Sequence, residues 1–199
     1  MVNLVLVISS ELEYRSLMWN LNCLTNSGED YDILCVVTKK SMYLKVRDWL
    51  NDNIDRGECL TVYLKPDRVD EIASILTQKN EFTFLVDSCN TVERRTLKTL
   101  LRDYLEKRDA GLIACDRDGD PAYYVKDIYG KYEEKQKIPL KDFAEIDVVS
   151  WNGILTKTEL LRQYFNGVEN YGNLSYSIQL RRLGFSNYVD NKTKLGGMK

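Results

Sequence analysis

Short, unbroken apolar runs alternate with longer amphipathic stretches in the first half of the chain, and this pattern strongly constrains the fold. The apolar runs cover residues 2–8, 31–37, 59–64 and 82–86. A strand without polar interruption is typical of a parallel sheet, because helices cover both of its faces. The segments between the runs have the apolar spacing of connecting helices. The sequence therefore predicts an α/β fold, with a mixed, mostly parallel, Rossmann-like sheet flanked by helices.

Capping signals predict where several helices begin. Three pairs have the spacing of a capping box: Ser10 with Glu13, Asn90 with Glu93, and Thr156 with Glu159. The helix after Asn90 is expected to bury one stripe, made of Leu97, Leu100, Leu101, Tyr104 and Leu105. A last helix is expected at 173–183, with Gly184 just beyond its end.

The pattern changes after residue 109. Segments 110–115, 121–132 and 146–151 are strand-like, 116–120 is predicted to be an acidic turn, 133–141 is predicted to be a charged loop, and the tail 185–199 is polar. Neither a repeat nor a linker divides the chain, so we expect a single domain over residues 1–199.

Composition excludes several kinds of chemistry. The chain has 199 residues, a net charge of -2 and no histidine, which excludes Ser-His-Asp hydrolysis and histidine metal sites within it. Its five cysteines are odd in number and form no CxxC, as expected for free thiols in a reducing cytoplasm. No apolar run reaches the roughly 18 residues needed to span a bilayer, and the N-terminus lacks a signal-peptide pattern. We therefore expect a cytoplasmic protein without a membrane partner.

The segment FTFLVDSCN, residues 82–90, carries the strongest functional signal. An apolar strand ends at Asp87, where α/β sheets place ligands and where a carboxylate can hold a divalent metal against a diphosphate. The segment resembles the Asp-x-Asp signature of GT-A glycosyltransferases, which use nucleotide sugars, although Cys89 stands at the second acidic position. A strand-end aspartate that caps the next helix is the alternative interpretation.

Two further stretches carry the resemblance to family-2-like members of this fold. VNLVLVISSELEYRSLMWNL is similar to the first strand, nucleotide loop and helix, and VSWNGILTKTELL followed by YGNLSYSIQLRRLGFSNYVD is similar to the acceptor half. The resemblance implies a nucleotide-sugar-binding half at 1–109 and an acceptor half at 110–199. It departs where Gly172-Asn173 replaces the family's acidic pair, and the family's frequent C-terminal metal histidine has no counterpart.

The resemblance implies a donor site for a nucleoside diphosphate sugar, above all a UDP-sugar, with Mg²⁺ or Mn²⁺ held by Asp87. Its expected lining follows the strand ends and comprises Ser9, Ser10, Arg15, Thr38, Arg68, Asp87 and Asn90. Helix capping explains Ser10 equally well, and a solvated turn explains Thr38.

The acceptor is expected beside Trp151, Asn152 and Gly153, with Trp151 also suited to filling the core. Glu169 and Asn173 are the candidate catalytic residues, and because an amide is no general base, Glu169 is the nearest spare carboxylate. The implied reaction is transfer of a sugar, a hexose or pentose, to an acceptor hydroxyl.

Several acceptors and two rival functions stay open. One possible acceptor is a hydroxymethylated base of duplex DNA, as in bacteriophage DNA-modifying enzymes. Binding of the duplex would require the basic residues at 94–102 and 181–199 to form one groove. The alternative interpretation of these basic residues is a solvated surface. A saccharide or a protein is an equally compatible acceptor. The rivals are a catalytically degenerate binding protein and a nucleotidyltransferase, although the first loop lacks the glycines that hold triphosphates.

Overall fold

The computed structural model describes residues 1–26, 28–55, 57–66, 71–76, 79–87, 90–117, 123–126, 132–135, 143–149, 153–165 and 173–197. At 87, 117, 123–126, 132–135, 173–175 and 197 it describes the backbone alone. No helix within these ranges is long and apolar enough to cross a membrane.

The four apolar runs form neighbouring parallel strands, as predicted. They are β1 (Val2–Ile8), β2 (Tyr31–Val37), β3 (Cys59–Tyr63) and β4 (Phe82–Asp87), in the order β3-β2-β1-β4. Because all four run in one direction, their carboxyl ends meet at the same edge of the sheet. We refer to this side as the carboxyl edge and to the opposite side as the amino edge.

The second half of the chain extends the same sheet. Strand β11 (Ile154–Lys157) lies antiparallel to β4 and is followed by β6 (Ala110–Arg117), β12 (Ser186–Gly197) and β5 (Asn90–Val92). Strand β9 (Phe143–Ile146) pairs with β12 beside this path. Since β6 and β12 run parallel to β4 while β11 runs against it, the sheet is mixed.

A second, three-stranded sheet joins β10 (Val148–Val149), β7 (Tyr123–Lys126) and β8 (Tyr132–Lys135) in antiparallel order. Strand β8 corrects the prediction of a charged loop at 133–141, because its charged residues pair through their backbones with the tyrosine-rich β7.

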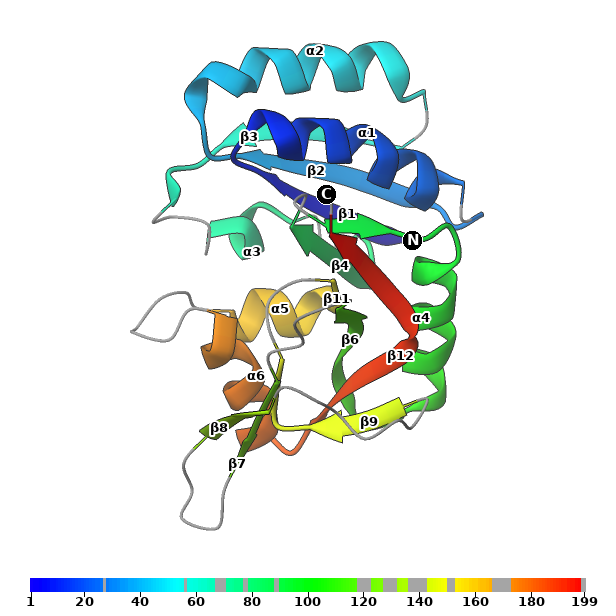
Figure 1. Cartoon of the computed structure of the whole chain (residues 1–199), viewed down its shortest axis with the longest axis vertical. Coiled ribbons are helices and arrows are strands. Elements are labelled where there is room, and N and C mark those ends of the chain that lie inside the picture. The colour runs from blue at the N-terminus through cyan, green and yellow to red at the C-terminus, as the bar shows by residue number, and fades with distance from the viewer. Residues whose placement is uncertain are drawn as a thin grey trace.

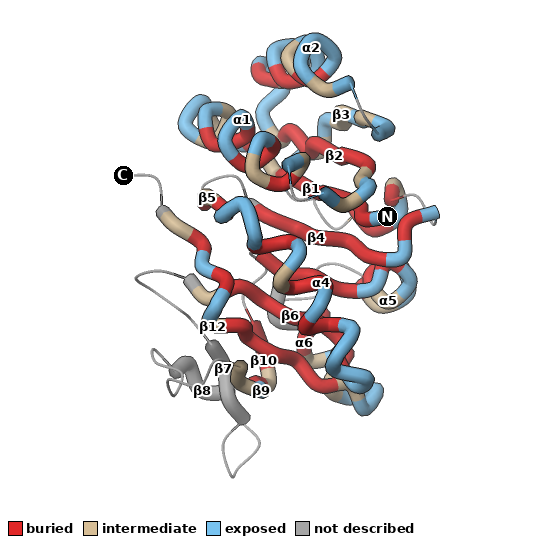
Figure 2. Tube along the Cα trace, turned by 90° about the vertical axis from the view of Figure 1, so that its right-hand side faces the viewer, coloured by how far each residue is buried: buried red, intermediate tan, exposed pale blue. Residues whose placement is uncertain are grey.

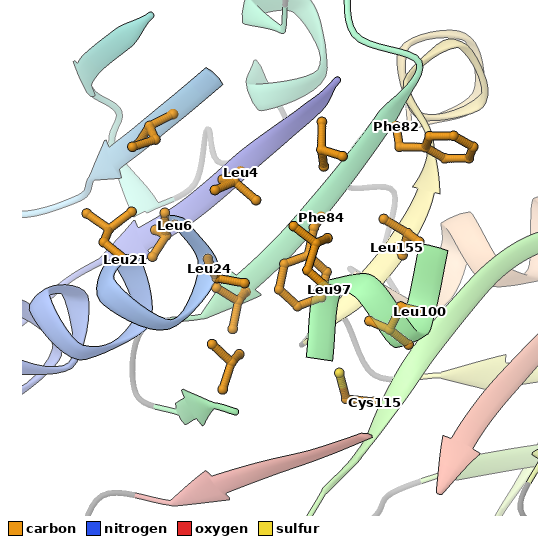
Figure 3. Packing of buried hydrophobic residues seen from close by; sticks show 14 of the residues in the cluster. Leu4, Leu6, Leu21, Leu24, Phe82, Phe84, Leu97, Leu100, Cys115 and Leu155 are labelled. Carbon is orange, nitrogen blue, oxygen red and sulfur yellow. The ribbon is translucent and has the colours of Figure 1, made fainter. Parts of the chain in front are cut away.

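Helices cover both faces of the main sheet (Figures 1 and 2). One face is covered by α1 (Glu11–Thr25), α2 (Tyr43–Asn53) and α4 (Thr96–Glu106). A 3-10 turn, η1 (Lys40–Met42), directly precedes α2 in the chain. The other face is covered by α3 (Ile72–Ile75), α5 (Thr158–Tyr164) and α6 (Asn173–Arg182). Alternate residues of each strand serve the two cores. Leu4, Leu6 and Phe84 meet α1 and α4 (Figure 3), whereas Val5 and Leu85 face α5 and α6. Apolar side chains on both faces explain the unbroken runs in the sequence.

The helix start predicted at Asn90 is wrong. Residues Asn90–Val92 form β5, and α4 begins only at Thr96. Asn20 of α1 holds β5 in place, since its Nδ2 donates to the Asn90 carbonyl at 2.7 Å and its Oδ1 accepts from the Val92 N–H at 3.0 Å. The predicted stripe of α4 is buried except for Leu105, which is 68% exposed.

Two other expectations about the second half need correction. Thr156 is no helix cap but a strand residue whose hydroxyl donates to the Gly111 carbonyl at 2.7 Å. The polar tail is β12, which buries Asn187 and Asp190 against specific partners. The last helix ends as predicted, with Gly184 beyond it at φ +89°, a conformation that favours glycine.

Candidate functional site

Strand register brings several of the predicted donor-site positions to the carboxyl edge. Val7 lies opposite Asp87, and Ile8 lies opposite Val37. Ser9 directly follows β1, so it lies beside the end of β4, and Thr38 directly follows β2, one strand further along the same edge. The edge therefore gathers Ser9, Ser10, Thr38 and the backbone of Asp87.

The first turn of α1 already holds an anion of its own, the Glu13 carboxylate. Glu13 accepts hydrogen bonds from the backbone N–H groups of Ser9 and Ser10, and the Ser9 hydroxyl donates to it at 2.6 and 2.8 Å. The Ser10 hydroxyl in turn accepts from the Glu13 N–H at 3.3 Å, which confirms the predicted capping box. A phosphate could reach these donors only by displacing Glu13, because the helix start attracts anions of either origin.

We expect Glu13→Ala to lower the free energy of unfolding by about 1 kcal/mol, because the first-turn N–H groups lose their acceptor. Urea denaturation measures this loss. Glu11→Ala is the matched control, since Glu11 is exposed in the same turn and, among the described residues, forms an ion pair with Lys45. Equal midpoints for the two variants would show that the box contributes nothing.

Thr38 and Arg15 differ in whether their polar side chains already form hydrogen bonds. The Thr38 N–H donates to the Ile8 carbonyl at 2.9 Å and its hydroxyl donates to the same carbonyl at 3.5 Å, so this residue also ties β2 to β1. Arg15 is exposed one turn into α1. Of the two, only Arg15 has an unengaged polar side chain within the described part of the chain.

Two other predicted positions have clear structural roles. Asn90 is 3% exposed in β5, where it lies opposite Gly197 of β12. Gly153 precedes β11 at φ +67°, and a Cβ added there would come within 2.6 Å of Leu195 Cδ1. Close packing against β12 thus explains this glycine.

The remaining predicted residues are less completely placed. Arg68, Trp151, Asn152 and Glu169 lie outside the described residues. Asn173 is the first residue of α6, where the backbone alone is described.

Sequence reasoning missed Asp116 and the end of β12 at this edge. Asp116 was expected in an acidic turn at 116–120, but it belongs to β6, where it lies opposite Lys194 of β12. Residues 118–120 of that expected turn lie outside the described residues. Beyond Lys194, β12 pairs with β5 (Figure 1), which follows the 87–90 segment. The polar residues of β12 concealed its strand character in the sequence.

A buried carboxyl pair supports the path of β12. Asp190 is fully buried at a bulge of β12, where its Oδ1 accepts from the Lys192 N–H at 2.9 Å and its carbonyl accepts from the Thr193 hydroxyl at 3.1 Å. Burial, with a contribution from the Asp103 carboxylate, raises the pKa of Asp190 to about 6. Arg102 binds Asp103 from outside at 2.7 Å. The carboxyl pair thus couples α4 to the strand that returns toward β5.

The donor atoms at the edge suit a metal shared with a ligand rather than a metal cage. Among the described side chains, no group of three acidic, cysteine or histidine residues could hold a metal ion. Asp87 and Asp116 lie at the ends of β4 and β6, with β11 between these strands, and the Glu13 carboxylate lies at the same edge. Mg²⁺ is often held by one or two carboxylates together with substrate phosphates. Residue 87, of which the backbone alone is described, is an aspartate and so has the side-chain chemistry for that arrangement.

Comparisons with solved structures identify the fold. A mannosyltransferase from Pyrobaculum calidifontis in complex with GDP-Man and Mn²⁺ matches with a TM-score of 0.70 at 14% identity, over 98% of this chain and 56% of that one. The fold is that of GT-A-like nucleotide-binding domains. Staphylococcus aureus TarS 1-349 in complex with UDP-GlcNAc matches with a TM-score of 0.62 at 13% identity, over 100% of this chain and 59% of that one. The chain thus spans little more than half the length of these two GT-A-like proteins.

A third structure shares the fold and nearly the whole length. It is the 4-diphosphocytidyl-2C-methyl-D-erythritol synthase from Anaerococcus prevotii, with a TM-score of 0.64 at 11% identity, over 96% of this chain and 86% of that one. No family model and no curated protein matches the sequence.

Proposed function

We propose that this GT-A-like chain is a metal-dependent glycosyltransferase that uses a nucleoside diphosphate sugar. The observation that carries the proposal is the register of β1 and β4, which sets Asp87 opposite Val7 and beside the start of α1. Two GT-A-like proteins of the same fold are described with GDP-Man or UDP-GlcNAc, which supports this donor class.

Every predicted donor residue except Asn90, which is buried in β5, has a part in this proposal. The nucleoside lies over Ser9, Ser10 and Thr38, where the Glu13 carboxylate can accept a hydrogen bond from a base N–H. The diphosphate lies toward Asp87, with Arg15 and Arg68 as cationic partners. A Mg²⁺ or Mn²⁺ ion held by Asp87 would neutralise the charge that develops on the departing diphosphate.

The acceptor reacts through a hydroxyl held beside Trp151, Asn152 and Gly153. Its oxygen bonds to the anomeric carbon of the sugar, while the bond to the diphosphate breaks and its electron pair leaves with the nucleotide. Glu169 takes the hydroxyl proton as general base, and Asn173, which cannot do so, orients the acceptor.

Charge pairing bears on the identity of the acceptor. Arg102 pairs with Asp103, and Arg181 pairs with Glu145 and Asp147, so these two arginines are partly neutralised within the chain. The remaining cations on α4 and before it, Arg94, Arg95 and Lys98, surround a separate hollow of about 200 Å³. A hydroxymethylated base of duplex DNA is therefore a weaker proposal than a saccharide or protein hydroxyl, because binding to duplex DNA rests on cations that neutralise its phosphates, and these two arginines already neutralise carboxylates of the chain.

One observation favours a second function, binding without catalysis. Glu13 neutralises the start of α1, and Cys89 and Asn173 replace acidic residues of the resembling enzymes. A degenerate binding protein would hold a nucleotide at the same edge of the sheet and leave its sugar bond intact.

A thermal-shift screen tests donor binding. We expect one nucleotide class among UDP-, GDP-, CMP- and TDP-sugars to raise the Tm only when Mn²⁺ is present. A ligand at a hundred times its Kd stabilises by about 2.7 kcal/mol, or roughly 5–10 °C for a chain of this size. No shift with any of the four classes would contradict the proposal. Hydrolysis of the bound sugar then separates the enzyme from the binding protein.

A further inference from the structure

A hollow of about 640 Å³ opens at the amino edge of the sheet, opposite the edge that carries Asp87. It lies where β4 begins and β11 ends, and it is lined by Asn80, Glu81, Lys157, Glu159, Arg162 and Gln163. Its volume falls in the range of small-molecule sites. None of these residues belongs to the proposed donor site.

The floor of the hollow is a buried network of polar side chains. Asn80 is fully buried, and its Nδ2 donates to Asn3 Oδ1 at 2.9 Å and to Asp32 Oδ2 at 2.7 Å. The Thr83 and Thr158 hydroxyls lie 2.9 Å apart in the same network. Asn80 Oδ1 accepts no hydrogen bond from any described residue. A buried acceptor without a donor is costly, and Asn80 lies beneath the hollow, where its side chain is closed to solvent.

The walls carry charges of both signs that do not pair with each other. Within the described residues, no ion pair joins Glu81 or Glu159 to Lys157 or Arg162, although all four line one hollow. Arg162 donates instead to the Leu76 carbonyl, which fixes its guanidinium beside α3. The hollow therefore presents strong acceptors and strong donors side by side.

We propose that this hollow is a saccharide-binding site. Each sugar hydroxyl both donates and accepts, so one sugar ring can satisfy the two glutamates and the two cations together. Glu81 and Glu159 would repel a purely anionic ligand, and Lys157 and Arg162 would repel a purely cationic one. A neutral polyhydroxylated ligand avoids both conflicts.

A neighbouring hollow of about 460 Å³ lengthens the site. It shares Glu81, Lys157, Glu159 and Gln163 with the first hollow, and it adds the aromatic residues Phe82, Tyr104 and Phe185. The Phe82 and Tyr104 rings are buried against each other, so the half-buried Phe185 supplies the apolar surface that suits the C–H face of a sugar ring, while the shared charged residues suit its hydroxyls. The two hollows together fit a chain of more than one sugar unit.

Nuclear magnetic resonance titration of the ¹⁵N-labelled chain with glucose, mannose, galactose and N-acetylglucosamine tests the site. We expect at least one sugar to shift the amide signals of residues 157–163 with a millimolar Kd, and the signals of residues 9–13 to stay unchanged. The proposal would be overturned if none of the four sugars shifted the signals of residues 157–163. A response to the zwitterion glycine betaine in place of the sugars would assign the hollow to a charged ligand and would overturn it as well.

A charge-neutral double variant locates the binding. Lys157→Ala with Glu159→Ala removes one cation and one anion from exposed positions, and we expect about tenfold weaker sugar binding, equivalent to about 1.4 kcal/mol. The matched control is Arg47→Ala with Asp48→Ala, an exposed pair on α2. Equal affinity in the two double variants would overturn the proposal. Because no nucleotide is present, failure of the proposed glycosyl transfer would leave this result unaffected.

Discussion

Asp87→Asn is expected to weaken Mn²⁺-dependent nucleotide binding at least about tenfold, or about 1.4 kcal/mol. The amide keeps the size of the carboxylate but removes the negative charge that holds a divalent cation against the diphosphate. Strand register places this residue opposite Val7, at the edge where Ser9 and Thr38 also lie. Calorimetry with and without Mn²⁺ measures the effect. Binding in the absence of metal should change little.

Asp30→Asn is the matched control for this prediction. It makes the same chemical change at an exposed residue before β2, at the amino edge of the sheet. A second variant, Asp116→Asn, asks whether the carboxylate at the end of β6 contributes to the same metal site. Equal Mn²⁺-dependent affinities for Asp87→Asn and the parent chain would rule out Asp87 as the metal ligand.

Asp190→Asn is expected to stabilise the chain by up to about 3 kcal/mol at neutral pH, because it removes a buried charge. The pKa of Asp190 is raised from 3.8 to about 6, so the native state holds a proton that the unfolded chain releases near pH 4. The stability that this proton contributes is complete below pH 4 and is lost as the pH rises through 6. The variant cannot ionise, so its advantage should appear between pH 4 and 6 and persist above.

Urea denaturation of both proteins across pH 4–8 measures this difference. Other groups face Asp190, namely Asp103, Arg102, Lys192 and Cys115, and none of them is changed in the variant. Asp109 titrates outside this window, because hydrogen bonds from Ser186 and Tyr188 lower its pKa. Asp48→Asn, an exposed control, should keep the pH dependence of the parent. A parallel pH dependence for Asp190→Asn and the parent would disprove the shifted pKa.

Local sequence was sufficient for the parts of the fold that depend on unbroken patterns. The four parallel strands were predictable because residues such as Leu4 and Val5 are apolar on both faces of the strand, which only a two-sided core requires. The cap of α1 was predictable because Ser10 and Glu13 bind each other within one turn. From these strands, the meeting of Ser9, Thr38 and Asp87 at one edge follows by the geometry of parallel pairing.

Tertiary contacts decided the elements whose sequence is polar. Strand β12 buries Asn187 because its Nδ2 donates to the carbonyls of Asp147 and Ser177, partners that no local pattern reveals. Strand β5 replaced a predicted helix start because Asn20, seventy positions earlier, binds its backbone.

The same division holds for the functional surfaces. The sequence alone determined that a carboxylate, Asp87, ends a buried parallel strand, since that depends on one apolar run. Only the folded chain placed Asp116 at the same edge and gathered Asn80, Glu81 and Lys157 around a hollow at the other. The physical reason is that a core pattern repeats along the chain, whereas a polar site joins side chains from distant segments through individual hydrogen bonds and charges.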